Sequence, residues 1–343
     1  MCSSDLFAPE PLSDGERAAL ATRTLDKAPP HIAGDYPEWL DGYLAQAFGE
    51  DRVAEATAMA SRAPLDLRVN TLKANREKIL PSLAHLGAKE TPWSPIGLRI
   101  ELGADARNPG IHAEEDFIKG GIEVQDEGSQ LAALFSAAKP GEQVIDLCAG
   151  AGGKTLALAA MMKGKGRLIA TDHDKRQLAP IYERLSRAGV HNCDVRTPKG
   201  PDDTLSDIHA SADLVVIDAP CTGTGTWRRN PDAKWRMRPG ALEVRLKDQI
   251  TVLDRAAALT KPGGRIAYIT CSVLPPENGE QIRGFVARHP EFAVVPPEQT
   301  TAVLWDKAED FTAATLPSAE GLLMTPRRTG TDGFFVSVLR RRA

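Results

Sequence analysis

The stretch Leu214-Val-Val-Ile-Asp-Ala-Pro-Cys-Thr-Gly-Thr-Gly225 indicates a buried strand that ends abruptly. Its run of four apolar residues is typical of a parallel strand that is covered on both faces. Pro220 cannot donate a hydrogen bond to a neighbouring strand, so we expect the strand to end just before it. Asp218 and Cys221 should therefore lie at the carboxyl end of a strand, where open α/β sheets bind their ligands.

A second apolar stretch, Arg265-Ile-Ala-Tyr-Ile-Thr-Cys-Ser272, also ends in a thiol, Cys271. From residue 143 onward, apolar runs alternate with helical patterns, which is typical of a parallel sheet with helices on both faces. We expect its strands near residues 143–148, 167–172, 192–196, 213–218, 264–270 and 333–340. The predicted class is α/β with a doubly wound sheet, and Cys221 and Cys271 should share one edge of it.

The composition excludes several classes of protein. With 42% hydrophobic and 26% charged residues, this chain of 343 residues is typical of a globular protein of two or three domains. The net charge of −4 gives no global nucleic-acid signal, so any basic surface must be local. The sequence contains no apolar run long enough to span a bilayer, and its start lacks a signal-peptide pattern. We therefore expect a cytoplasmic protein without a membrane partner.

The cysteines do not follow the pattern of a disulfide framework or a metal site. They are Cys2, Cys148, Cys193, Cys221 and Cys271. Their number is odd and no Cys-x-x-Cys pair occurs, so we expect neither structural disulfides nor a zinc site. Cys148 and Cys193 lie in strand-like contexts, where core packing is the simplest interpretation.

The chain divides into three parts on sequence patterns. We expect a helical N-terminal segment, a small α+β domain of RNA-binding type and a catalytic domain over residues 1–60, 61–123 and 124–343. In the second part, residues 65–70 and 98–102 alternate between apolar and polar residues, which predicts two half-buried strands. Arg68, Asn70 and Lys73 in or after the first strand indicate either a solvated face or contact with a phosphate backbone.

A glycine-rich loop, Asp146-Leu-Cys-Ala-Gly-Ala-Gly-Gly-Lys-Thr155, follows a strand and opens a helix. Its glycines let the backbone pass close to a ligand, and Asp172 at the end of the next strand is placed to bind ribose hydroxyls. Dinucleotide dehydrogenases and S-adenosylmethionine-dependent methyltransferases share this combination. The dehydrogenase pattern Gly-x-Gly-x-x-Gly is absent, and a P-loop would need glycine in place of Cys148. The plain alternative is a tight turn without a ligand.

Four motifs follow one another along the third part of the chain. They are residues 146–155, residues 218–225, Arg229-Asn-Pro-Asp232 with Lys234-Trp235, and Thr270-Cys-Ser-Val-Leu-Pro-Pro-Glu-Asn278. Together they resemble the RsmB/Sun (Fmu-type) family of RNA 5-methylcytosine methyltransferases. Residues 68–73, 124–130 and 326–335 resemble further elements of that family, so the resemblance covers roughly residue 36 to the end. It implies a class I S-adenosylmethionine-dependent methyltransferase fold with a mostly parallel, seven-stranded sheet.

The resemblance implies covalent catalysis with two thiols. A thiolate of Cys271 would add to carbon 6 of cytosine, so that carbon 5 can take the methyl group. Cys221 would help to remove the carbon 5 proton and to release the enzyme. Asp218 would hydrogen-bond the base at N3 and at its exocyclic amine, and Lys154 would lie near the same site. A thiol with an ordinary pKa of about 8.5 is mostly protonated at neutral pH, so Cys271 needs an activating environment.

The same resemblance implies S-adenosylmethionine as the cofactor. The residues implied in binding it are Cys148, Ala149, Gly150, Ala151, Gly152, Gly153, Lys154, Asp172, Arg176 and Asp218. The family usually places an acid after the third strand, against the adenine, and the candidates here are Asp194, Asp202 and Asp203. Ala151 stands where the family often has proline, which should change only the stiffness of the loop.

The segment from Trp227 to Lys247 carries seven cations and two tryptophans. Cations contact phosphates and aromatic rings stack on bases, so the segment indicates RNA contact, with a solvated helix face as the alternative. We expect a monomer that acts on an unpaired or flipped cytosine of ribosomal RNA, with transfer RNA as the alternative substrate. A small-molecule or DNA methyltransferase would not need this segment. A non-catalytic RNA-binding assembly factor would tolerate loss of Cys271.

Overall fold

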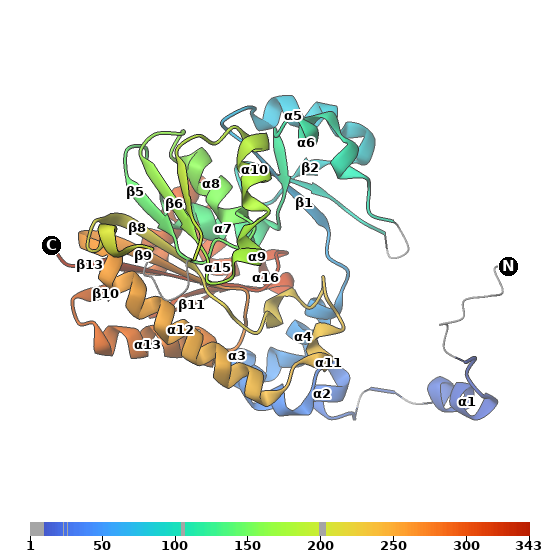
Figure 1. Ribbon diagram of the computed structural model, residues 1–343. Helices are drawn as coiled ribbons and strands as arrows, with labels where there is room; N and C mark the ends of the chain where they lie inside the picture. The colour runs from blue at the N-terminus through green and yellow to red at the C-terminus, as the bar shows by residue number, and fades with distance from the viewer. Residues whose placement is uncertain (1–9, 23, 26, 104–106, 199–203) are drawn as a thin grey trace.

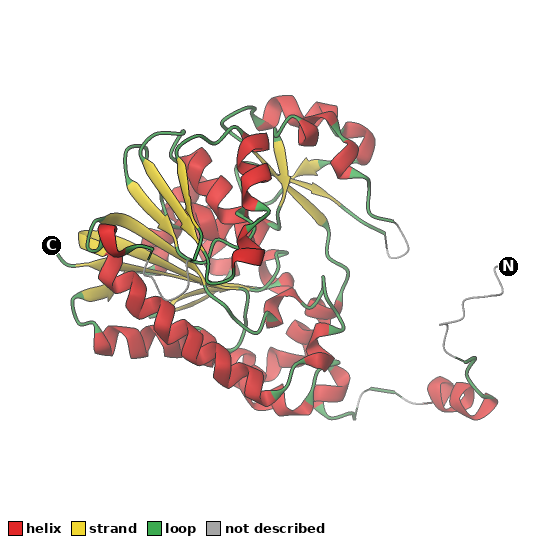
Figure 2. Ribbon diagram, in the orientation of Figure 1, coloured by secondary structure: helices red, strands yellow, loops and turns green. Residues whose placement is uncertain are grey.

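The computed structural model describes residues 10–22, 24–25, 27–103, 107–198 and 204–343. This described part contains a sheet of nine strands with helices on both faces and a separate sheet of four strands (Figures 1 and 2). The neighbours in the larger sheet run β7-β6-β5-β8-β9-β13-β12-β11, and β10 pairs with β13. Its strands are β5 Gln143–Asp146, β6 Arg167–Thr171, β7 Cys193–Arg196, β8 Ala212–Asp218, β9 Thr260–Thr270, β10 Phe292–Val294, β11 Leu316–Ser318, β12 Gly321–Met324 and β13 Phe334–Arg341.

The directions of these strands confirm the predicted class. β5 is parallel to β6 and β8, β6 is parallel to β7, and β8 is parallel to β9. β13 then pairs antiparallel with β9, and β12 with β13. The short strands β10 and β11 are the two that the sheet has beyond the predicted seven. The order reverses between β5 and β8, so the carboxyl ends of these two strands border the crevice where such sheets bind ligands.

Apolar runs rather than alternating patterns mark the central strands because helices cover both faces. On β5, Val144 packs into one core and Ile145 into the other, and Val216 and Val215 of β8 divide in the same way. The core containing Val144 includes residues of α7, α8 and α10, and the other includes residues of α12 and α13. These helices are α7 Glu127–Phe135, α8 Gly153–Met161, α10 Ile181–Ala188, α12 Pro239–Leu259 and α13 Gly279–Arg288.

The smaller sheet has the antiparallel order β2-β3-β1-β4. Its elements are β1 Leu65–Val69, α5 Arg76–Ser82, β2 Lys89–Glu90, β3 Gly97–Ile100, α6 Glu115–Ile118 and β4 Ile122–Val124. Leu67, Leu98 and Ile122 of the sheet pack with Ile79 of α5 and Phe117 of α6 in a core of their own. The strands predicted at residues 65–70 and 98–102 are thus present as β1 and β3.

The N-terminal helices differ in how they pack. α1, Asp14–Thr22, contains no buried residue, whereas Tyr36, Leu44, Phe48 and Met59 belong to the core of the α12 and α13 face. All four residues are buried, and they lie in or between α2 Pro30–Ala33, α3 Asp41–Phe48 and α4 Arg52–Ala60. Domain boundaries at residues 60 and 123 stay predictions. Among the described residues, none of the helices combines the length and apolar character that crossing a membrane requires.

Arg68 and Asn70 do not form the solvated or phosphate-binding face that their pattern suggested. Both side chains are buried, and Arg68 Nε donates to Gln125 Oε1 at 2.6 Å. Asn70 Nδ2 and Lys73 Nζ donate to backbone carbonyl oxygens at the end of α10, at 2.9 and 2.6 Å. These polar residues therefore attach the small sheet to the domain that contains the larger sheet. A strand pattern alone does not distinguish such contacts from solvent exposure.

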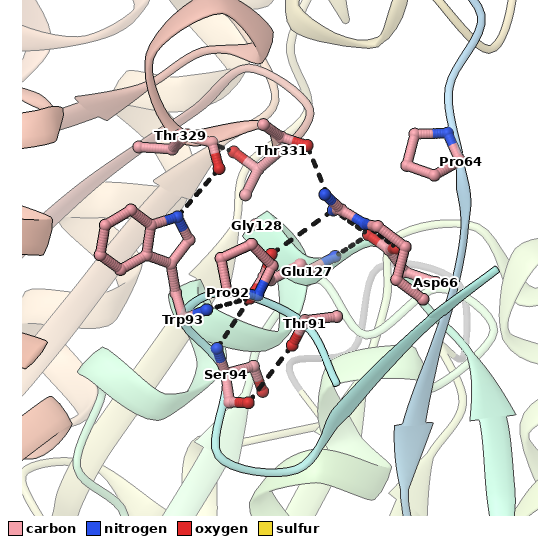
Figure 3. A network of polar contacts seen from close by, with 12 residues as sticks. Pro64, Asp66, Thr91, Pro92, Trp93, Ser94, Glu127, Gly128, Thr329 and Thr331 are labelled. Carbon is pink, nitrogen blue, oxygen red and sulfur yellow. Dashed lines mark hydrogen bonds and ion pairs between the residues drawn. The ribbon is translucent and has the colours of Figure 1, made fainter. Parts of the chain in front are cut away.

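A second polar network joins the small sheet to the turn before β13 (Figure 3). Arg99 Nε lies 2.7 Å from Asp66 Oδ1, and Arg99 Nη2 lies 3.4 Å from Glu127 Oε2. Glu127 also accepts the backbone N–H groups of Trp93 and Ser94, each at 2.7 Å. Trp93 Nε1 donates at 2.9 Å to a carbonyl oxygen of that turn. The side chains of Asp66 and Glu127 are fully buried, so Arg99 is their charge partner away from solvent.

Replacement of Arg99 by leucine is expected to lower the free energy of unfolding by about 3–5 kcal/mol, because two buried carboxylates lose their partner. Urea unfolding followed by circular dichroism measures this. The matched control is Arg283→Leu, which removes an exposed pair with Glu320 and should lower the free energy by at most about 1 kcal/mol. An equal loss in both variants would contradict the assignment of Arg99 as a buried link.

Candidate active site

A cavity of about 360 Å³ opens at the crevice between β5 and β8. Its lining includes Cys148, Ala149, Gly150, Ala151, Gly153, Lys154, Asp172 and Asp218, all predicted as cofactor residues. It also includes Val124, Gln125, Ser129, His173, Gln177, Arg184 and Pro220, which were not predicted. The motif at residues 124–130 was a signal for the first three of these. No sequence signal pointed to Arg184, because only the packing of α10 brings this residue to the glycine loop. There its Nη1 donates to Ala151 O at 2.9 Å.

The glycine loop combines two different uses of glycine. Gly150 and Gly152 have φ angles of 50° and 85°, in the left-handed region that favours glycine. A Cβ on Gly150 would meet no atom within 4 Å, so the backbone there is open. A Cβ on Gly152 would lie 2.5 Å from Ile181, so this glycine allows α10 to approach the start of α8. Gly152, although predicted to bind the cofactor, is not among the residues that line the cavity.

Asp172 is fixed beside the loop at the end of β6. Its Oδ2 accepts the Gly150 N–H at 2.9 Å, and its Oδ1 accepts the Asp174 N–H at 3.0 Å. The side chain is nearly buried yet lines the cavity, so its carboxylate faces the space where a ligand would lie. Arg176, on α9 Lys175–Leu178, is exposed and does not belong to the lining. Spacing in the sequence does not reveal that Gln177, the next residue, lines the cavity while Arg176 does not.

The acid expected against the adenine is not found at Asp194. Its Oδ2 lies 3.0 Å from Arg196 and 3.4 Å from Arg167, and the residue does not line the cavity. These two ion pairs explain the position of its side chain at the surface of β7. The other candidates, Asp202 and Asp203, lie outside the described residues.

Asp146, the last residue of β5, is completely buried beneath the loop. Burial raises its pKa to about 7 from an ordinary 3.8, although Thr155 Oγ1 donates to it. The folded state therefore binds more protons than the unfolded state between these two values, so the free energy of unfolding should fall as pH rises through this window. Asp146→Asn should remove this contribution. Urea unfolding of both proteins from acidic to mildly alkaline pH checks it, and identical pH slopes would contradict it.

The two thiols lie against each other, as predicted for strand ends on one edge. Cys221 follows β8 and Cys271 follows β9, which are parallel neighbours. Their Sγ atoms are 3.4 Å apart. The hydrogen bond with Cys271 and burial raise the pKa of the Cys221 thiol well above its usual range, and the Glu277 carboxylate acts in the same direction. The pair is therefore arranged with Cys221 as a protonated thiol beside the Cys271 sulfur.

Lys154 forms an ion pair with Asp218, the last residue of β8, which precedes Cys221 by three residues. Lys154 Nζ lies 2.7 Å from Asp218 Oδ2 and 5.2 Å from the centre of the Phe334 ring. The lysine side chain is 6% exposed, whereas that of Asp218 is 37% exposed and lines the cavity. The buried ammonium group thus holds an accessible carboxylate in a fixed orientation.

The start of the cation-rich segment is part of the protein interior. Trp227 and Arg228 are buried, and the Nε atoms of Arg228 and Arg229 both donate to Asp332. The Nη2 atoms of the two arginines reach Asp126 at 3.2 and 2.8 Å. Both arginines are paired with two aspartates from distant parts of the chain. Arg228 is buried and does not offer the RNA-facing surface that was predicted, whereas Arg229 is exposed and its contact with RNA stays a prediction.

The later part of the segment faces solvent. Trp235, on α11 Ala233–Arg236, is 57% exposed, and Lys234 Nζ lies 5.6 Å from the centre of its ring. Arg236, Arg238 and Lys247 are exposed. An exposed aromatic ring with cations around it can stack on a base beside a phosphate backbone.

The strand order, the loop anchored by Asp172 and the crevice between β5 and β8 are those of the class I S-adenosylmethionine-dependent methyltransferase fold. A family model described as 16S rRNA methyltransferase RsmB/F matches residues 133–340. A second model, the ferredoxin-like domain of RsmF/B-like methyltransferases, matches residues 36–107. The chain belongs to the RsmB/F family.

Individual relatives agree with this assignment. The chain is 32% identical over 314 residues to a probable ribosomal RNA small subunit methyltransferase B of Synechocystis, covering 89% of this chain and 67% of that protein. It is 34% identical over 261 residues to ribosomal RNA small subunit methyltransferase B of Salmonella newport, covering 76% and 59%. The crystal structure of a methyltransferase homologue from Pyrococcus horikoshii has a TM-score of 0.72 and 25% identity, covering 91% and 97%. The chain thus spans about three fifths to two thirds of the two named methyltransferases.

Proposed function

We propose that the protein methylates carbon 5 of a cytosine in ribosomal RNA, using S-adenosylmethionine. The observation that carries this proposal is the pair of Sγ atoms 3.4 Å apart at the carboxyl ends of two parallel strands. The segment that leads to Cys221 also forms part of the cavity wall, because Asp218 and Pro220 line the cavity. The names of the Synechocystis and Salmonella relatives support ribosomal RNA as the substrate.

The cavity fits S-adenosylmethionine. When bound, this cofactor supplies a methyl group activated by the positive charge of its sulfonium. The backbone at Gly150 is open for close approach. The Asp172 carboxylate accepts two N–H groups and lies 3.0 Å from His173 Nδ1, and its remaining lone-pair capacity is available to a ribose hydroxyl. The cavity that contains Gly150 and Asp172 is also lined by six other residues predicted to bind the cofactor: Cys148, Ala149, Ala151, Gly153, Lys154 and Asp218.

Cys271 acts as the nucleophile. Its thiolate forms a bond from Sγ to carbon 6 of the cytosine, and the electron pair of the carbon 5–carbon 6 double bond becomes available at carbon 5. That pair would then form the new bond to the methyl group, while the bond between this methyl group and the cofactor sulfur breaks and leaves its electron pair on that sulfur. The neighbouring Cys221 keeps its own proton at this stage because the contact with Cys271 raises its pKa.

Cys221 resolves the adduct. Once Cys271 has become a thioether, it carries no charge that would raise the pKa of Cys221, so Cys221 can lose its proton more readily. The Cys221 thiolate then takes the proton from carbon 5. The released electron pair restores the carbon 5–carbon 6 double bond, and the bond between carbon 6 and the Cys271 sulfur breaks.

Asp218 holds the target base. Its accessible carboxylate can accept a hydrogen bond from the exocyclic amine, and a second one from N3 when N3 is protonated. The ion pair with Lys154 fixes the orientation of the carboxylate. Outside the cavity, Trp235 with Arg236, Arg238 and Lys247 offers an exposed surface for the flanking RNA.

The test is incubation with labelled S-adenosylmethionine and separate pools of ribosomal and transfer RNA, followed by sequencing for 5-methylcytosine. One strong site in ribosomal RNA is the expected result. Label only in transfer RNA would keep the chemistry and overturn the substrate. Absence of label from free RNA and from ribosomal subunits alike would overturn the proposal and favour a non-catalytic RNA-binding factor.

A further inference from the structure

Glu277 is a buried acid that the mechanism above does not use. It lies in the short turn Pro275–Glu277 after β9, within the motif Thr270–Asn278, and it is completely buried. Its nearest hydrogen-bond donors come from three separate elements. A charged side chain is rarely fully buried unless its hydrogen bonds are satisfied, so this one is expected to hold something in place.

On one side, Glu277 holds the residue next to Cys221. Its Oε1 accepts the backbone N–H of Thr222 at 2.8 Å, and its Oε2 accepts the Thr222 hydroxyl. Gln249 of α12 completes this side, because its Nε2 donates to Glu277 Oε1 at 3.1 Å and to Pro220 O at 2.9 Å. The residues before and after Cys221 are thus both fixed.

On the other side, Glu277 holds the residue next to Cys271. Its Oε2 accepts the hydroxyl of Ser272, which also lies 3.1 Å from the Thr224 hydroxyl. The neighbouring Asn278 donates to Ser272 O at 2.9 Å and accepts the Thr270 hydroxyl at 2.6 Å. The two residues that flank Cys271 are therefore held by the same turn.

We propose that Glu277 is a positioning residue that clamps the two thiol-bearing loops together and so sets the contact between Cys221 and Cys271. One carboxylate accepts from Thr222 and from Ser272, each adjacent in sequence to a thiol. The Gly225 N–H donates to Cys271 O at 2.9 Å and so also joins the two loops, but Glu277 is bonded to the residue directly after each thiol. The effect of this clamp on catalysis rests on the proposed function. The clamp itself is a property of the folded protein.

Glu277→Gln keeps the shape of the side chain but replaces one accepting oxygen with an amide that can only donate. We expect kcat for methyl transfer to fall about 100-fold, since misplacement of reacting groups by about 1 Å has effects of that size. The KM for S-adenosylmethionine should not change, because Glu277 does not line the cavity. Because a loss of folded protein would also lower the apparent kcat without changing KM, kcat is calculated per folded site, counted by the stoichiometry of S-adenosylmethionine binding.

A second readout reports the distance between the thiols without RNA. Diamide oxidises two adjacent thiols to a disulfide while it is itself reduced to the hydrazine, and peptide mapping quantifies the link between Cys221 and Cys271. The rate should be lower in Glu277→Gln than in the wild-type protein. The matched control is Glu127→Gln, which changes an equally buried carboxylate that also joins two loops but lies in the network of Figure 3. The control should leave both kcat and the disulfide rate unchanged.

Two further variants keep the test decisive if Glu277→Gln does not fold. Thr222→Val and Ser272→Ala each remove one hydroxyl donor, and each should lower the disulfide rate. The double variant should lower the disulfide rate by a smaller factor than the product of the two single factors, because both hydroxyl groups act through the Glu277 carboxylate. Unchanged disulfide rates in the folded variants would overturn the inference even if RNA methylation stands. If wild-type protein does not methylate RNA but the rates fall, the clamp stands and the proposed function fails.

Discussion

Cys271→Ala is expected to lower kcat for RNA methylation on the order of 10⁴-fold or more, because loss of a nucleophile leaves only binding and orientation. Binding of S-adenosylmethionine should be unchanged, since Cys271 does not line the cavity. Incorporation of labelled methyl groups into ribosomal RNA measures the first quantity, and isothermal calorimetry measures the second.

The control for this prediction is Cys193→Ala. Cys193 is also a partly buried free thiol, but it lies at the start of β7, away from the ends of β8 and β9. This variant should keep wild-type activity. Wild-type activity in Cys271→Ala would show that the mechanism does not depend on this nucleophile.

Cys221→Ala should have a different effect, the accumulation of a covalent complex between protein and RNA. With Cys271 intact, the adduct at carbon 6 still forms and carbon 5 still takes the methyl group. Without the Cys221 thiol, 3.4 Å from Cys271, no nearby thiolate takes the carbon 5 proton, so elimination stops. A band of reduced mobility on a denaturing gel with labelled RNA is the expected result.

The double variant Cys221→Ala with Cys271→Ala should give no such band, because the adduct can no longer form. A band in the double variant would assign the covalent link to another residue. Turnover of Cys221→Ala at the wild-type rate without any band would remove Cys221 from the resolving step.

Much of the catalytic domain could be predicted from local sequence patterns. The apolar runs at β5, β6 and β8 are visible because a strand covered by helices on both faces needs no polar positions. Pro220 marks the end of β8 for an equally local reason. Since parallel neighbours end at one edge, the contact between Cys221 and Cys271 followed from the position of each thiol after its strand.

The role of the charged residues could not be predicted in this way. Arg68 was expected on a solvated or phosphate-binding face and Arg228 in a segment that contacts RNA, yet both are buried. The partner of Arg228, Asp332, lies 104 residues further along the chain. The number of cationic residues in a segment does not show which of them will be paired with carboxylates that are distant in the sequence.

The sequence by itself determined the kind of fold, the glycine loop with Asp172 and the placement of both thiols after strands, because strand patterns, glycine conformations and proline breaks act over a few residues. Only the tertiary structure decided which charges remain free and what supports the thiols. The clamp formed by Glu277 joins Thr222 to Ser272 across 50 residues of chain, and a buried carboxylate is stable there only because donors from both loops and from α12 meet at it.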